Sequence, residues 1–456
     1  MENLKQKENK IQQLCWCCIL LLSSIWFTSA QEQVVELDLP AVLEVGGADN
    51  LSIDRYEKEQ ELAEANYLKA KSWWLPDLSL GVRSEHLWGA AMNADGGFFL
   101  EVERNNLWLG PEMNLSWDFG KDIYKLKAEE LKLRAADFET REEKNQAILR
   151  GIEVYYEFKN AQLSRTAYDR MAEIADTVSM QLEIQVDAGF RYQSEVLTSQ
   201  SNTKHLQIQS LESEKEFLEK QEELRELLDV NATVELRAAD DLLLPLELIS
   251  EDELMNITPD SAVGRRPGIE AIDNRILATK EEKKQVTTGL LLPKLSIGAY
   301  TSYFGGFFET VTPMRAEQEP SPQSLYPTTA IQASLIWDIP LGQIFYKGEP
   351  KRYDAVIGLQ KNEREQFENK VTREVKSARA KLINSKRQLE IAEESEELAR
   401  EALSQSIERQ KSGTAAPFEV FQAQEYYLRS RLDYLMVVSQ YNTVQYQLYV
   451  ALGNDL

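Results

Sequence analysis

The chain is 456 residues long, 28% of its residues are charged, and its formal net charge is −24. Such acidity argues against a nucleic-acid-binding protein, whose surface is basic. Catalysis has little support either. The two histidines, His86 and His205, are far apart in sequence, and the chain contains no phosphate-binding glycine loop, nucleophile elbow or His-Glu-x-x-His motif. We therefore expect neither an enzyme nor a cofactor.

The N-terminus has the pattern of a secretory signal peptide. Three lysines precede an apolar run over residues 18–27, and Thr28-Ser29-Ala30 supplies small residues for cleavage. We expect the signal peptide to cover 1–30. A membrane anchor is the alternative, but the run is too short to span a bilayer comfortably. All three cysteines lie in this segment, so the mature chain is expected to have neither disulfides nor thiolate metal sites.

An irregular segment and a first helix are predicted within 31–72, with the helix beginning after Asn50 or Ser52. Apolar and polar residues then alternate within 73–119, and they do so again within 291–342. Period two over this length predicts a strand pair in each segment. The apolar faces are expected to carry Leu78, Leu80, Val82, Met113, Leu115, Trp117 and Phe119 in the first pair, and Leu295, Ile297, Ala299, Ile331, Ala333, Leu335, Trp337 and Ile339 in the second.

Other segments connect and follow these strands. The stretches 88–108 and 304–327 are rich in Gly, Phe, Asn, Pro and Ser and predict long loops. Long charged helices are predicted within 120–230 and 343–453, and about 65 helical residues would extend about 100 Å, too far for a compact globule. Their expected ranges are 121–187, 192–229, 350–411 and 417–452. Segment 231–263 is predicted to be a connector, and Arg266-Pro267 is predicted to open a helix within 264–290 that ends near residue 285.

Several phrases occur twice in the same order. Residues 75–81 read Leu-Pro-Asp-Leu-Ser-Leu-Gly, and residues 292–298 read Leu-Pro-Lys-Leu-Ser-Ile-Gly. Glu195-Val196 matches Glu419-Val420, and Gly189 matches Gly413, at one spacing of 224 residues. Fixed-order self-similarity predicts an internally duplicated unit made of a strand pair and a long helical hairpin.

The four predicted strands have an apolar face that nothing else in the chain is reserved to cover. In a secreted bacterial protein, lipid is the natural cover, but a lipid-facing sheet must close on itself. Barrels begin at about eight strands, so three copies with about twelve strands would be needed. Trp73, Trp74, Trp88, Trp117 and Trp337 lie near strand ends, where they suit interfacial girdles.

The doubled strand starts, the Arg266-Pro267 helix start and the two Gly-x5-Glu-Val phrases together resemble the TolC-like outer-membrane efflux proteins. The resemblance covers 50–453. It implies a homotrimer with a twelve-stranded barrel in the outer membrane and an α-helical barrel across the periplasm. It also implies a periplasmic adaptor and an inner-membrane transporter as partners, in a tripartite efflux or type I secretion system that exports drugs, metals or proteins.

By the same resemblance, a gate is expected at the helix tips. Glu419 would be its acidic residue and Glu195 the first-half counterpart. The sequence departs from the family pattern at Gln422, where a second acid is expected, and at Ala415, where a basic latch residue is expected; Arg191 occupies the equivalent first-half position. With Gly189 and Gly413, these are the candidate gate residues. Alternatively, Glu419 only favours the start of its helix, as first-turn carboxylates do.

A secreted trimeric coiled-coil stalk or adhesin is the other class we consider. Its long helices would be expected to carry sustained heptads without inserted strand pairs. The two predicted strand pairs at matched positions therefore favour the channel. The acidic balance would favour cations if carboxylates line the lumen.

Overall fold

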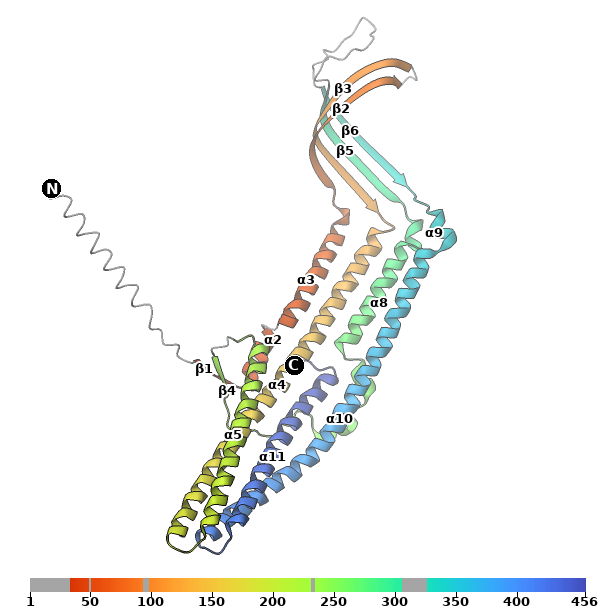
Figure 1. Cartoon of the computed structure of the whole chain (residues 1–456). Coiled ribbons are helices and arrows are strands. Elements are labelled where there is room, and N and C mark those ends of the chain that lie inside the picture. The colour runs from red at the N-terminus through yellow and green to blue at the C-terminus, as the bar shows by residue number, and fades with distance from the viewer. Residues whose placement is uncertain (1–32, 49–50, 93–97, 231–233, 306–325) are drawn as a thin grey trace, which may run out of the picture.

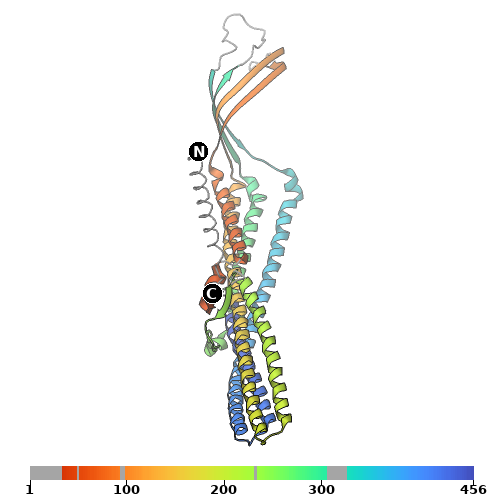
Figure 2. The ribbon, with the colours of Figure 1, turned by 60° about the vertical axis from the view of Figure 1, so that its left-hand side comes forward.

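The computed structural model describes residues 33–48, 51–92, 98–230, 234–305 and 326–456. The expected signal peptide, 1–30, lies outside these residues. The molecule is elongated, with a β-sheet at one end and two helical hairpin tips at the other (Figure 1). A view from a second direction shows that it is also narrow (Figure 2). The fold is mainly α with a small β part, as predicted.

Helices make up most of the described chain, and the two longest have 66 and 64 residues. At about 1.5 Å per residue, each is about 100 Å long. The predicted ends of the first helix, the four long helices and the helix that Pro267 opens are confirmed to within two residues. The helices are α2 (Leu39–Ala48), α3 (Leu51–Lys71), α4 (Asp122–Asp187), α5 (Gln193–Leu227), α6 (Glu251–Asn256), α7 (Pro259–Val263), α8 (Pro267–Gln285), α9 (Leu341–Tyr346), α10 (Gly348–Lys411) and α11 (Pro417–Ala451), with single 3-10 turns at Ser72–Trp74 and Thr288–Leu291.

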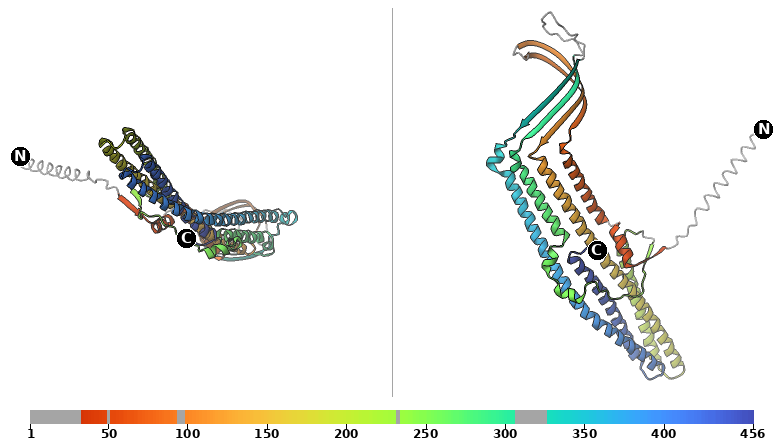
Figure 3. Two further views of the ribbon diagram at one scale, coloured as in Figure 1. Left: turned by 90° about the horizontal axis from the view of Figure 1, so that it is seen from below. Right: turned by 180° about the vertical axis from the view of Figure 1, so that it is seen from behind.

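The helices lie side by side as one layer. Nearer the sheet, α3 packs on α4, and α8 packs between α4 and α10 (Figure 3). Nearer the tips, α5 packs on α4, and α11 packs between α4 and α10. Each shorter helix thus covers only part of the length of a long one: α3 and α8 have 21 and 19 residues, and α5 and α11 have 35 each.

The sheet at the far end joins strands from both halves of the chain. Its antiparallel order is β2-β3-β5-β6, so β3 of the first half pairs with β5 of the second. This order leaves β2 and β6 each with one unpaired edge in the single chain. The strands are β2 (Asp77–Met92), β3 (Phe98–Asp118), β5 (Lys294–Gly305) and β6 (Tyr326–Ile336).

The register of the sheet gathers apolar side chains on one face. Leu78, Met113, Ala299 and Ile331 are cross-strand partners in one row across all four strands. Because side chains alternate along a strand, a row of serines, Ser116, Ser296 and Ser334, lies on the opposite face. Leu78 is 73% exposed and Ile331 is 78% exposed, so the chain leaves its own apolar row uncovered. The predicted alternation is confirmed within the strands, but Phe119, Trp337 and Ile339, which were expected to belong to it, lie beyond the ends of β3 and β6.

The first hairpin differs from the prediction. Strand β2 continues to Met92 and β3 begins at Phe98, so most of the expected loop over 88–108 is paired strand. Glycine and asparagine in this stretch suggested a loop, but a long antiparallel pair tolerates them once its register is set. The other expected loop, 304–327, falls mostly outside the described residues, between the end of β5 and the start of β6.

Two short strands were not predicted, nor was helix α2, which lies in the segment expected to be irregular. β1 (Gln33–Leu37) pairs in parallel with β4 (Val234–Ala238), which joins the N-terminal segment to the connector. The side chain of Gln162 on α4 fixes this small sheet by accepting a 2.9 Å hydrogen bond from the Ala238 amide. The connector then lies against α11, because the amides of Leu246 and Ile249 donate to side chains of that helix.

A buried arginine holds the middle of the layer together. Arg266, immediately before α8, is 2% exposed and donates from Nε to Glu142 of α4 at 3.1 Å and from Nη2 at 2.5 Å. Its Nη1 donates to the Val450 carbonyl of α11 at 3.1 Å and lies 3.4 Å from a carboxylate oxygen of Glu374 on α10. One side chain therefore ties the start of α8 to three other helices, and the satisfied bonds offset the cost of burying its charge.

Candidate functional site

The candidate site is the end of the molecule farthest from the sheet, where the α4–α5 and α10–α11 hairpins lie next to each other (Figure 1). Helix α4 ends at Asp187 and α5 begins at Gln193; α10 ends at Lys411 and α11 begins at Pro417. Apolar residues of both hairpins, including Val196 and Val420, form one small buried cluster just behind the turns. The two tips are therefore packed as a unit.

The turns share one geometry, which explains the two glycines found from sequence. Gly189 has a φ of 77° and Gly413 a φ of 75°, a left-handed conformation that favours glycine. After Gly189, the amide of Phe190 donates to the carbonyl of Gln185 at 2.9 Å. After Gly413, the amide of Thr414 makes the equivalent 2.9 Å bond to the carbonyl of Arg409. Each long helix thus ends in a Schellman motif.

Arg191 bridges the two tips. Its Nη2 donates a 2.7 Å hydrogen bond to the carbonyl oxygen of Ala415 and lies 3.5 Å from that of Gly413. Its Nη1 lies 3.7 Å from a carboxylate oxygen of Glu195 in the first turn of α5. The guanidinium thereby joins one hairpin to the backbone of the other, and its positive charge is paired with Glu195 of its own hairpin.

The two expected gate carboxylates have different surroundings. Glu195 beside Arg191 is 27% exposed, whereas Glu419 is 46% exposed and lies 3.3 Å from Nη1 of Arg409 at the end of α10. In the described residues of the single chain, no ion pair joins Arg191 to Glu419. Glu419 does lie in the first turn of α11, as the alternative role for it requires. Gln422 is exposed.

Two buried glutamines behind the tips were missed by the sequence analysis. Gln410 on α10 is fully buried, and neither its amide nitrogen nor its carbonyl oxygen has a hydrogen-bond partner in the chain. Gln424 on α11 accepts a 3.2 Å hydrogen bond from Asn202 of α5 but leaves its own amide nitrogen unpaired. Buried polar groups without partners are unusual. Nothing in the local sequence distinguishes them from solvated helix residues.

Metal sites and membrane-spanning helices are both absent from the described part of the chain. No group of three or more His, Cys, Asp or Glu side chains within it could hold a metal ion. Its helices include none that is long and apolar enough to cross a membrane.

Among the comparisons with known proteins, only the one with solved structures finds matches. No protein-family model and no curated protein matches the chain. Among solved structures, the outer-membrane channel OprN superposes with a TM-score of 0.69 at 17% identity, covering 91% of this chain and 90% of that one. A membrane protein from Pseudomonas aeruginosa gives 0.72 at 16% identity, covering 93% and 92%. The CmeC outer-membrane channel of Campylobacter jejuni gives 0.70 at 15% identity, covering 94% and 90%.

The chain has the fold of the TolC-like outer-membrane channels. The likeness extends over more than nine tenths of the chain. In this channel fold, the exposed apolar row and the unpaired edges of the sheet lie at one end, and the Arg191 bridge lies at the other. The fold resemblance expected from the sequence is therefore confirmed.

Proposed function

We propose that the chain is one subunit of a trimeric outer-membrane channel that extends into the periplasm. In this assembly, three copies supply twelve strands to one barrel and twelve helix positions to one α-helical barrel. The channel would form the exit conduit of a tripartite efflux or type I secretion system. Its partners would be a periplasmic adaptor, an inner-membrane transporter and outer-membrane lipid, with no role for nucleic acid.

The sheet is the observation that carries this proposal. Four antiparallel strands cannot close a barrel, and backbone groups at an open edge cannot be satisfied in lipid. The unpaired edges of β2 and β6 would meet in neighbouring copies and close the ring. The uncovered apolar row that contains Leu78 and Ile331 would then face lipid, and the serine row would face the lumen.

The two halves support the same assembly. We infer that each carries one copy of a duplicated unit, because α4 with α5 and α10 with α11 follow the strand pairs in the same order and end in equivalent turns. Two near-equivalent halves in three copies would give a ring with close to sixfold repetition, which suits a closed helical barrel.

The tips would serve as the periplasmic gate. We infer that Gly189 and Gly413 form its turns, that Arg191 and Glu195 hold the two hairpins of one subunit together, and that Glu419 faces the axis. Gln422, one turn later and uncharged, would leave Glu419 as the acidic residue of the second hairpin. The exposure of Glu419 supports this assignment, since a carboxylate in a narrow lumen must stay accessible to ions.

A secreted stalk or adhesin stays the alternative. Such a protein would also have long helices, but it would have no reason to keep a four-stranded sheet with an exposed apolar row. The discriminating experiment separates membranes from soluble fractions and compares migration of unheated and boiled samples in gels. The channel predicts a heat-modifiable species in the outer-membrane fraction; a stalk predicts recovery without the barrel-dependent shift.

A further inference from the structure

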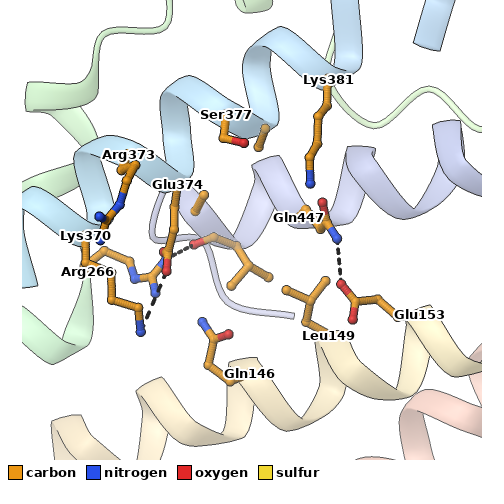
Figure 4. A pocket seen from close by; sticks show the side chains of 13 residues that line it. Gln146, Leu149, Glu153, Arg266, Lys370, Arg373, Glu374, Ser377, Lys381 and Gln447 are labelled. Carbon is orange, nitrogen blue, oxygen red and sulfur yellow. Dashed lines mark hydrogen bonds and ion pairs between the residues drawn. The ribbon is translucent and has the colours of Figure 1, made fainter. Parts of the chain in front are cut away.

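An open cavity of about 420 Å³ lies midway along the helical layer, between α4, α10 and α11 (Figure 4). It lies where the end of α11 meets the start of α8, since Val450, Ala451 and Arg266 line it. Helix α10 contributes most of the charged lining. The lining side chains are Gln146, Leu149, Glu153, Arg266, Lys370, Arg373, Glu374, Ser377, Ala378, Lys381, Gln447, Val450 and Ala451.

The cavity is basic in a strongly acidic chain. Its lining includes four cationic side chains and two carboxylates, which leaves a surplus of two positive charges, whereas the whole chain carries −24. Three of the cations, Lys370, Arg373 and Lys381, follow one another on α10 at spacings of three and eight residues. These spacings place them on one side of the helix, toward the cavity.

Both carboxylates already have partners. Glu374 lies 3.4 Å from Arg266 and 3.7 Å from Lys370. Glu153 accepts a 2.7 Å hydrogen bond from Gln447 and lies 3.9 Å from a guanidinium nitrogen of Arg150.

The two remaining cations, Arg373 and Lys381, are exposed and form no ion pair within the described part of the chain. Figure 4 shows the Lys381 side chain extending into the space between α10 and α11, toward Gln447. The surplus charge of the cavity is therefore available to a ligand.

The cavity opens on the face of the layer that the connector leaves free. The connector bonds to Asn442 and Gln445 of α11. The cavity uses Gln447 and Ala451 of the same helix, and successive residues turn by about 100°, which puts these pairs on opposite sides. A second cavity, between the connector and α10, is lined by Leu382, Lys386 and Gln445 and shares no lining residue with the basic cavity.

We propose that this cavity binds a small anionic molecule through its phosphate or carboxylate groups, with Arg373 at one end of the cavity and Lys381 at the other as the principal contacts. Arg373 offers a planar fork of N–H donors, and Lys381 offers a compact ammonium. The site itself rests on the single chain. Its place on the lumen wall rests on the proposed function. In the trimer, three copies of the cavity would form a basic belt inside an otherwise acidic conduit. This belt would select anionic cargo at that level.

The test is isothermal titration of the full-length protein in detergent with inorganic phosphate and, separately, with succinate. We expect binding of at least one probe, and an affinity about tenfold or more weaker after Arg373→Gln with Lys381→Gln, since charge-assisted hydrogen bonds are lost. Preference between the two probes identifies the source of the anionic group. The matched control is Lys376→Gln, which removes a cation of α10 that does not line the cavity; its affinity should match the parent's.

Equal affinity in all three proteins, or no binding of either probe by the parent, would overturn the site. Conductance in planar bilayers, measured on the same samples, keeps this result separate from the proposed function. If the parent protein conducts but its anion binding does not depend on Arg373 and Lys381, the proposed site is wrong and the proposed channel is unaffected. If the parent binds phosphate through these residues but neither it nor Arg191→Ala conducts, the site stands and the channel is contradicted.

Discussion

Arg191 donates a hydrogen bond of 2.7 Å to the carbonyl oxygen of Ala415, which is the residue that occupies its own position in the second hairpin, 224 residues later. The first hairpin thus supplies a cation at the place where the second supplies only a backbone acceptor. A bond between matched positions of two similar turns holds the tips at a fixed separation.

Replacing Arg191 with alanine should loosen the contact between the hairpins. The bond to Ala415 and the ion pair with Glu195 are both lost, so we expect a higher conductance of the resting channel in planar bilayers. The matched control is Arg170→Ala, which removes an exposed arginine from α4 away from the tips. Equal resting conductance in the parent and in both variants would show that Arg191 does not restrain the gate.

Replacing Glu419 with glutamine should weaken cation preference and block by divalent cations. Three copies of this carboxylate near the axis would attract cations, although Arg409 at 3.3 Å offsets part of each charge. Reversal potentials in a salt gradient measure the selectivity, and Gln422→Ala is a neutral control one turn away. Unchanged selectivity in Glu419→Gln would leave this residue with only its role at the start of α11.

Replacing Arg266 with methionine should destabilise the middle of the helical layer. Removing one member of a buried ion pair typically costs about 3–5 kcal/mol, because the other charge stays buried without its partner. Thermal unfolding followed by helical circular dichroism measures the loss, and Arg265→Met at the exposed neighbouring position is the control. Combining Arg266→Met with Glu142→Met should recover part of the stability. A single Arg266→Met variant as stable as Arg265→Met contradicts the buried pair's role.

The proposed orientation places the β5–β6 connection outside the cell and the tips in the periplasm, since outer-membrane barrels carry their longer loops outside. Single cysteines introduced as Gln318→Cys and Thr414→Cys report this with an impermeant thiol reagent, because the native cysteines lie in the expected signal peptide. We expect position 318 to react in intact cells and position 414 only after permeabilisation. The reverse pattern would invert the topology.

Local signals predicted most of the helices. Pro267 and Pro417 begin α8 and α11 because proline suits the first helical position, and Gly189 and Gly413 follow α4 and α10 because they adopt a positive φ. The alternation within the strands is equally local. These features depend on residues close together in sequence, so the sequence alone was enough to find them.

Long-range contacts could not be predicted in the same way. The pairing of β1 with β4 joins two five-residue strands about two hundred residues apart. Neither strand has a sequence pattern that identifies the other as its partner. Arg191 was identified as a candidate, but its acceptor is a backbone carbonyl, which any residue provides. The basic cavity was missed because Arg373 and Lys381 resemble ordinary solvated helix residues until α4 and α11 are placed beside them.

The proposed function depends most on three copies of the chain enclosing a conducting pore. Planar-bilayer recording of the purified full-length protein tests it directly, with native mass spectrometry of the same sample to establish the number of subunits. We predict a trimer that gives discrete current steps, with larger steps from Arg191→Ala. A stable folded monomer, or a trimer that inserts into lipid and passes no current even with Arg191→Ala, would contradict it.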